Sequence, residues 1–395
     1  MRLRRTVHTV ETLVSRSKPV SLLLLFTAAL IMLFYAGDRV PPVQRLLPSL
    51  TRCDGPTDAR IAELADWAHR QGLPGLQVAH VDAEGRQLSC ASGWSRFVPL
   101  PERMRPDHRF RYASLSKLLT LALALKAIAA HQLDPQDRVI DLLAIEGELA
   151  DPRIREMTVA QLMNHTAGFD RTLSGDSMTS ADVWCPGRLS HLANISLDHR
   201  PGTQFAYANL GYCLLAQAVV RATGRPLQSL FDDDLLMPLQ AQAIRPARGG
   251  SYAPDETRYF FDPAEGPDSL LSFDYHANLP SGGWSGTASD LALLLHRVYG
   301  PASKLLPTPV IAEALAAPPD CTDQRWRTCH VAGYYRYREG DGRVMFWRDG
   351  SLPGVTAFAA LFGNGEVLVV LANSRSPDWM RVHDALGREV YRLFH

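Results

Sequence analysis

The stretch Ser114-Leu115-Ser116-Lys117 comes directly before an apolar run, residues 118–130, that predicts a helix. Residues i and i+3 lie on one face of a helix, so the amine of Lys117 can reach back to the hydroxyl of Ser114. A desolvated lysine can become a neutral base, whereas arginine keeps its proton, and this chain has only four lysines among its 41 basic residues. Ser114 is therefore a candidate nucleophile.

The motif is weak by itself, because Ser15-Arg16-Ser17-Lys18 has the same spacing in a segment that cannot form an active site. A solvated lysine at a helix start is the alternative interpretation of Lys117.

A second polar group is Tyr207-Ala208-Asn209, which precedes a predicted helix over residues 210–223 that ends at Gly224. A phenol whose pKa is lowered by neighbouring cations can relay a proton, and the Asn209 amide can both donate and accept hydrogen bonds. The alternative is a core tyrosine followed by an asparagine that caps the helix.

Five short segments occur in one order along the chain: Ser114-x-x-Lys117, Leu162-Met163-Asn164-His165-Thr166-Ala167-Gly168-Phe169, Tyr207-x-Asn209, Gly282-Gly283-Trp284-Ser285-Gly286-Thr287-Ala288-Ser289-Asp290 and Asp349-Gly350-Ser351-Leu352-Pro353-Gly354. In this order, roughly residues 57–395 resemble serine hydrolases of the class C β-lactamase superfamily, which includes penicillin-binding D,D-peptidases, D-aminopeptidases and family VIII esterases. The resemblance implies that Ser114 is acylated, that Lys117 and Tyr207 share the proton transfers, and that Asn209 orients Lys117 and the substrate.

The third motif departs from this family, which usually has Lys-Thr-Gly or His-x-Gly where this chain has Arg348-Asp349-Gly350. Arg348 keeps a positive charge and can bind a carboxylate through two hydrogen bonds, but it cannot relay protons. We therefore expect Arg348 to be an electrostatic and substrate-anchoring group. The alternative is that Arg348 turns to solvent.

The position of Ser114 at a helix start also predicts an oxyanion hole, because backbone N–H groups are unpaired there. The N–H of Ser114 is the first expected donor. By resemblance, the second is the N–H of Ser351, which follows Gly350, where the missing side chain lets the strand approach the substrate.

The N-terminal part predicts a membrane anchor. The apolar run 19–36 is about long enough to span a bilayer, and more basic residues precede it than follow it, which places residues 1–18 in the cytoplasm. Residues 37–52, with three prolines, read as a linker, and the domain 53–395 is expected outside the cytoplasm, at the inner membrane. The alternative is a cleaved signal peptide and a secreted enzyme.

All six cysteines follow this run, so an oxidising compartment favours disulfides over reactive thiols. Six cysteines permit 15 pairings, which the sequence cannot resolve. Cys321 and Cys329 bracket a short polar loop and are expected to bridge it, and Cys53 and Cys90 are expected to join the first helix to the early strands. Cys185 and Cys213 remain by elimination.

The order of predicted elements indicates an α+β fold. Helix 59–71 and strands 76–82 and 87–93 come early, and strands 343–347, 355–362 and 366–373 and helix 379–394 come late. We expect an antiparallel sheet built from both chain ends and flanked by the terminal helices. Residues 53–113 and 281–395 would form this α/β lobe, residues 114–280 an inserted helical lobe, and the site would lie between them.

Other features limit the function. The net charge of zero offers no basic surface for nucleic acid, and we find no metal-ligand cluster, so neither a metal nor a cofactor is expected. His165 is expected to be a packed histidine, and the Asp232–Asp234 run a solvated helix face. Tyr334, Tyr335 and Tyr337 fit a substrate groove or ordinary strand positions.

The leading hypothesis is a membrane-anchored serine hydrolase that forms an acyl-enzyme with an ester, a D-amino-acid amide or peptide, or a β-lactam. A peptidase or esterase is favoured over a β-lactamase, because nothing in the sequence shows how water would be activated for deacylation. The alternative is a non-hydrolytic protein that binds peptidoglycan or lipid on the same scaffold. The oligomeric state stays open.

Overall fold

The computed structural model describes Thr27 and residues 50–395, except 57, 98–99, 181, 263–264, 319–320 and 341. Apart from Thr27, the predicted anchor 19–36 and the linker up to residue 49 lie outside the described residues. Within the described part of the chain, no helix has the length and apolar character that crossing a membrane requires.

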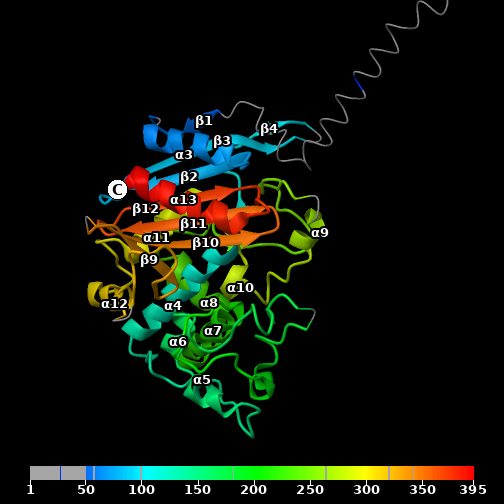
Figure 1. Cartoon of the computed structure of the whole chain (residues 1–395), viewed down its shortest axis with the longest axis vertical. Helices are drawn as coiled ribbons and strands as arrows, with labels where there is room; N and C mark the ends of the chain where they lie inside the picture. Colours follow the sequence, from blue (N-terminus) through cyan, green and yellow to red (C-terminus); the bar gives the residue numbers. More distant parts are fainter. Residues whose placement is uncertain are drawn as a thin grey trace, which may run out of the picture.

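The described residues form a large antiparallel sheet that contains strands from both ends of the chain, as expected (Figure 1). The central pairing is between β2 (Gly75–Val81) and β12 (Val367–Ala372), which joins the early strands to the late ones. In spatial order the strands are β1 (Thr51–Cys53), β3 (Gln87–Arg96), β2, β12, β11 (Val355–Phe362), β10 (Val344–Leu352), β9 (Tyr334–Arg338) and β8 (His330–Val331), with β4 (Glu102–Arg103) paired to β3.

The terminal helices α3 (Ala59–Arg70) and α13 (Trp379–Phe394) cover one face of this sheet, as expected. Their apolar residues, such as Leu64 and Leu386, pack with Trp347 and Phe358 of the sheet in one buried cluster. The opposite face packs against α11 (Ala288–Tyr299) and against the turn that carries Ser114. Because neighbouring residues of a strand face opposite sides, β10 contributes to both layers.

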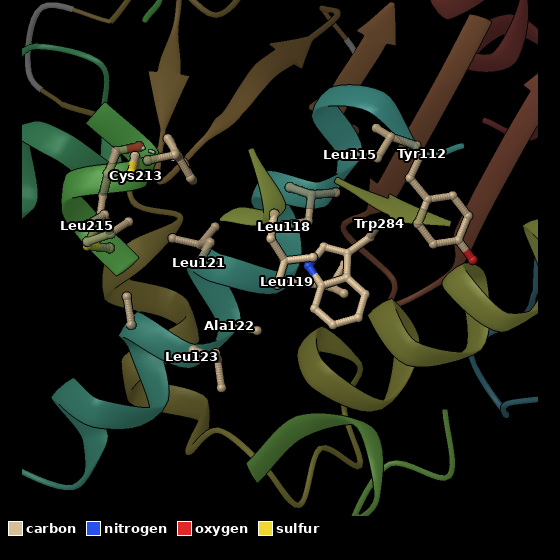
Figure 2. Packing of buried hydrophobic residues seen from close by; sticks show 14 of the residues in the cluster. Tyr112, Leu115, Leu118, Leu119, Leu121, Ala122, Leu123, Cys213, Leu215 and Trp284 are labelled. Atoms are coloured by element: carbon tan, nitrogen blue, oxygen red, sulfur yellow. Dashed lines mark hydrogen bonds between the residues drawn. The ribbon is translucent and has the colours of Figure 1, made fainter. Parts of the chain in front are cut away.

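The helical lobe is built around α4 (Ser116–Ala129) and α7 (Asn209–Thr223). Nearly every side chain of α4 is buried, which is why the run 118–130 is apolar all round. In Figure 2 the leucines of α4 lie between Trp284 on one side and Cys213 and Leu215 of α7 on the other. The shorter helices are α5 (Val139–Leu142), α6 (Val159–Met163), α8 (Leu227–Phe231), α9 (Gly266–Leu271), α10 (Leu279–Gly282) and α12 (Thr308–Ala314).

Part of the predicted helical lobe packs against the α/β lobe. Strand β6 (Arg245–Pro246) joins β7 (Trp284–Gly286), which also pairs with β5 (Phe110–Arg111) in a small sheet. Glu256 forms a buried ion pair with Arg111, at 2.7 Å between Nε and Oε1. This ion pair therefore holds the loop around Glu256 against β5 of the α/β lobe. Hydrophobic periodicity in the sequence does not reveal such a contact.

The three expected cysteine pairs are confirmed: Cys53–Cys90, Cys185–Cys213 and Cys321–Cys329 are disulfides. One detail was wrong, because Cys53 lies in β1 directly opposite Cys90 in β3. This disulfide therefore joins two adjacent strands and not a helix to a strand. The strand 343–347 was also predicted too short, since β10 continues through the third motif to Leu352.

Candidate active site

Ser114 lies in a 3₁₀ turn, Ala113–Leu115, directly before α4 and not within the helix itself. The preceding residue, Ala113, has φ 49°, a left-handed conformation that is unfavourable for alanine. Ala113 is fully buried, so the surrounding packing imposes this strained turn. The hydroxyl of Ser114 faces the phenol of Tyr207, with 2.7 Å between the two oxygens.

Lys117 is fully buried. We expected its amine to reach the Ser114 hydroxyl and accept the proton, but among the described residues its hydrogen bonds go elsewhere. Its Nζ donates at 2.6 Å to Oδ1 of Asn209 and at 2.6 Å to the carbonyl of Ser281. Burial lowers the pKa of Lys117, Tyr207 opposes this shift and the nearby Arg348 adds to it, and together they bring the pKa to about 8. The Ser114 hydroxyl is therefore hydrogen-bonded to the Tyr207 phenol. The Lys117 amine is connected to this phenol through Oδ1 of Asn209.

Tyr207 and Asn209 point the same way because Ala208 between them is extended, with φ −142° and ψ 133°. The Tyr207 hydroxyl donates to Oδ1 of Asn209 at 3.2 Å. The Asn209 side chain makes no cap bond, and Ala208 is the cap residue, so the helix-cap alternative for Asn209 was wrong. Burial raises the pKa of Tyr207, but the positive charges of Lys117, Arg348 and Arg171 outweigh it and lower this pKa to about 8.

Arg348 is 1% exposed, so the alternative in which it turns to solvent was wrong. Its guanidinium lies 4.8 Å from the centre of the Tyr207 ring, and Nη1 donates to the carbonyl of Gly333 at 3.2 Å. Arg348 does not line the cavity in front of Ser114. The expected anchoring of a substrate carboxylate therefore has no support in this arrangement, whereas the electrostatic effect on Tyr207 and Lys117 does.

Gly350 brings strand β10 directly against the Ser114 turn. A Cβ at this position would lie 2.9 Å from the backbone nitrogen of Ser114 and 2.9 Å from the carbonyl of Tyr112. Only glycine permits this approach. Ser351, the next residue, lines the same cavity as Ser114, so the two predicted oxyanion donors border one space. Their role stays a prediction.

The cavity at Ser114 has a volume of about 350 Å³. A larger cavity of about 570 Å³ lies elsewhere and does not contain Ser114, so size alone does not locate the chemistry. The smaller cavity is lined by Ala113, Ser114, Arg171, Thr172, Asp176, Thr179, Asn209, Phe273, Ser281, Gly282, Ser351 and Leu352.

Two charged residues of this cavity, Arg171 and Asp176, were not predicted. They lie in a polar loop between α6 and α7, where no periodicity or motif distinguishes them from ordinary surface residues.

His165 is buried and packs against the rings of Tyr207 and Tyr212, at centroid distances of 4.7 and 5.1 Å. Burial, together with the cations of Arg348 and Lys117, lowers the pKa of His165 well below its usual value. This neutral, packed histidine agrees with the expected structural role. Asp232 and Asp234 likewise bond to neighbouring side chains, and the described residues contain no cluster of three or more His, Cys, Asp or Glu suited to a metal.

A family model described as Beta-lactamase matches residues 57–391. The probable fimbrial assembly protein FimD, serogroup H1, of Dichelobacter nodosus is 34% identical over 290 residues, which cover 72% of this chain and 71% of that protein. The D-alanyl-D-alanine-carboxypeptidase/endopeptidase AmpH of Escherichia coli (strain K12) is 29% identical over 140 residues, or 35% of this chain and 36% of that protein.

Among solved structures, the D-amino acid amidase from Ochrobactrum anthropi SV3, complexed with L-phenylalanine amide, superposes with a TM-score of 0.70. The match covers 85% of this chain and 96% of the amidase, at 20% sequence identity. At this identity the likeness concerns the fold, and it agrees with the α+β arrangement described above.

Proposed function

This chain belongs to the beta-lactamase family, and on that premise we propose that it is a serine hydrolase that forms an acyl-enzyme through Ser114. The observation that carries this proposal is the 2.7 Å contact between the Ser114 hydroxyl and the Tyr207 phenol. The pKa of this phenol is lowered to about 8 by three surrounding cations, so roughly a tenth of it is ionised at pH 7 and can accept the proton of Ser114.

The proposed reaction begins when Tyr207, with Lys117 behind it, takes the proton from Ser114. The alkoxide attacks the acyl carbon of the substrate, and the N–H groups of Ser114 and Ser351 stabilise the negative oxygen that forms. The same proton then passes to the leaving group, which leaves an ester on Ser114. A water molecule later hydrolyses this ester and restores the free hydroxyl. Asn209 holds Lys117 in place through its Oδ1.

For the substrate we propose an acyl compound of small size, with a D-amino-acid amide or peptide or an ester favoured over a β-lactam. The cavity of about 350 Å³ suits a small molecule or a single peptide residue. Similarity to proteins named as a D-amino acid amidase and a D-alanyl-D-alanine-carboxypeptidase supports the same class. The loops around the site decide among such substrates in this fold.

We also propose that residues 53–395 form a two-lobed domain outside the cytoplasm, held at the inner membrane by the run 19–36 or secreted after its cleavage. The support is the pairing of all six cysteines in disulfides, which persist in oxidising compartments. N-terminal sequencing of the native protein distinguishes the two cases. A start near Ala36 would exclude the anchor.

A second candidate function is participation in fimbrial assembly, which the name of the 34% identical FimD relative favours. In this case the same acyl chemistry would act on a fimbrial protein or peptide. Replacing the chromosomal gene with a Ser114→Ala copy should then reduce surface fimbriae as strongly as deletion does. Normal fimbriation of the deletion strain would exclude this process.

The test of the hydrolase is labelling of the full chain by a fluorophosphonate, followed by intact mass analysis. We expect one adduct on the wild type and none on Ser114→Ala. A matched control is Ser15→Ala, since Ser15 has the same Ser-x-x-Lys spacing and should leave labelling unchanged. If the wild type forms no adduct and hydrolyses no p-nitrophenyl ester, the non-hydrolytic binding protein becomes the better description.

A further inference from the structure

One loop of the helical lobe, residues 170–180, brings two opposite charges to the cavity at Ser114. The guanidinium of Arg171 lies 4.4 Å from the centre of the Tyr207 ring. Asp176 contacts Asn209, and it is the one carboxylate among the described residues that line this cavity. In the proposed reaction Arg171 is only one of the three cations around Tyr207, and Asp176 has no role.

The contact between Asp176 and Asn209 determines which way the Asn209 amide faces. Nδ2 of Asn209 donates to Oδ2 of Asp176 at 2.6 Å, while its Oδ1 accepts from Lys117 at 2.6 Å and from Tyr207 at 3.2 Å. An ionised carboxylate can only accept hydrogen bonds, so it binds the NH₂ end of the amide and not the oxygen end. A reversed amide would place NH₂ against the amine of Lys117.

Asp176 is itself held by its own loop. Its Oδ1 accepts the backbone N–H of Met178 at 3.1 Å, and Met178 is 1% exposed. The carbonyl of Met178 in turn accepts from the fully buried Asn278 at 2.8 Å. The carboxylate therefore has one oxygen fixed by the loop and the other directed at Asn209, which is the arrangement of a preorganised support.

The charges of the loop act on the proton-transfer pair in the same sense. Asp176 favours the protonated amine of Lys117, and Arg171 favours the ionised phenol of Tyr207, so both stabilise the ammonium–phenolate state. The other titratable or charged groups around the pair are Arg348 on β10, Tyr212 on α7 and His165.

We infer that Asp176 is a positioning residue of the proposed reaction, which orients the Asn209 amide and through it Lys117, and that Arg171 and Asp176 together set the charge distribution of the site. The inference rests on the proposed function. Loop 170–180 then not only forms part of the cavity wall but also controls the proton transfer at Ser114.

The experiment measures the rate of fluorophosphonate labelling of the full chain between pH 5 and 10. Asp176→Ala removes both the acceptor and the charge, so labelling at the pH plateau should fall about tenfold or more. Asp176→Asn keeps an acceptor oxygen, and its plateau should lie closer to the wild type. Ser177→Ala, a neighbour in the same loop, is the control and should behave as the wild type.

The pH midpoint of labelling separates the electrostatic role from a purely structural one. Loss of the negative charge lowers the pKa of the pair, so both Asp176 variants should move the ascending limb to lower pH. Arg171→Gln removes a positive charge and should move it to higher pH. A merely structural loop would shift neither midpoint.

A double-mutant cycle tests whether Asp176 acts through Asn209. In an Asn209→Ala background, Asp176→Ala should slow plateau labelling by less than twofold, because the amide that it orients is absent. A full tenfold loss in that background would overturn the positioning role. If Asp176→Ala does not fold, as judged by thermal unfolding, the midpoints of Asp176→Asn and Arg171→Gln decide in its place.

Different results would contradict the proposed hydrolase and the role of Asp176. An unlabelled wild type contradicts the proposed function, and the role of Asp176 falls with it. A wild type labelled on Ser114, together with Asp176→Ala that labels at the wild-type rate and with an unmoved midpoint, leaves the hydrolase intact and overturns only the role of the loop.

Discussion

The two faces of strand β10 differ in whether their buried charge has an oppositely charged partner. Arg348 and Asp349 are neighbours, so their side chains point to opposite sides of the sheet. On the side of Ser114, Arg348 is buried beneath Tyr207 without a bonded carboxylate among the residues that the structure describes. On the side of α13, Asp349 accepts hydrogen bonds from Arg327 at 2.7 Å and shares one with His383 at 3.0 Å.

This difference separates a structural charge from a functional one. Asp349 is matched by its partners, so its charge links β10, α13 and the loop that carries Arg327. Arg348 is not matched by a carboxylate, so its field acts on the groups in front of it and lowers the pKa of Tyr207 and Lys117. A buried cation without a bonded carboxylate lowers the stability of the fold. Charges of this kind occur mainly at functional sites, where they shift the pKa values of neighbouring groups.

The largest expected effect is on the matched face. Asp349→Ala should lower the free energy of unfolding by about 3–5 kcal/mol, because it leaves the buried His383 and the half-buried Arg327 without their shared partner. Urea unfolding measures it, with Asp384→Asn, the more exposed partner of Arg327, as the milder control.

The pH dependence of this effect has a defined sign. Burial raises the pKa of Asp349, but His383 and Arg327 outweigh it and hold the pKa far below its usual value. The contribution of Asp349 is therefore present above the ordinary carboxylate pKa and is lost as the pH falls below it. If Asp349→Ala lowers the free energy of unfolding by less than 1 kcal/mol at neutral pH, Asp349 is not needed for stability. The two faces of β10 would then not differ in the way described above.

A smaller effect is expected for the loop that carries Arg327. The Cys321–Cys329 disulfide closes this loop over a sequence separation of 8 residues, so replacing both cysteines with alanine should cost about 2–3 kcal/mol. Fluorophosphonate labelling of Ser114 should stay close to that of the wild type, because the loop supports the far face of β10. A tenfold loss of labelling would show that the two faces are coupled.

The smallest effect in free energy is expected at Arg348. Arg348→Met should slow labelling about tenfold, which corresponds to about 1.4 kcal/mol, while unfolding stability stays unchanged or rises. Removing the positive charge raises the pKa of Tyr207 and Lys117, so the ascending limb of the pH profile should move to higher pH. Arg348→Lys keeps the charge and should keep the midpoint. An unmoved midpoint in Arg348→Met would exclude the electrostatic role.

Much of the fold followed from local patterns. The helices at both chain ends, strand β11 and the helix that ends at Gly224 were predicted within a few residues, because hydrophobic periodicity and end signals depend on near neighbours in the chain. Strand β10 was predicted too short since Arg348, Asp349 and Gly350 do not alternate in polarity. Their strand conformation comes from pairing with β11.

The candidate site was predictable only in part. The motifs placed Ser114, Lys117, Tyr207 and Asn209 in one site, and the structure brings these four together. The i+3 spacing pointed to a contact between Lys117 and the hydroxyl, whereas the hydrogen bonds of the amine among the described residues go to Asn209 and the carbonyl of Ser281.

The sequence by itself determined which chemical groups this protein has and where most of its helices and strands lie, but not the C-terminal part of β10. Only the tertiary structure decided that the phenol of Tyr207, 93 residues from Ser114 along the chain, is the partner of its hydroxyl. It also decided that Arg348 is buried and that Asp176 faces Asn209. The physical reason is that local conformation depends on neighbours a few residues away, whereas contacts and desolvation between distant segments depend on the packing of the whole chain.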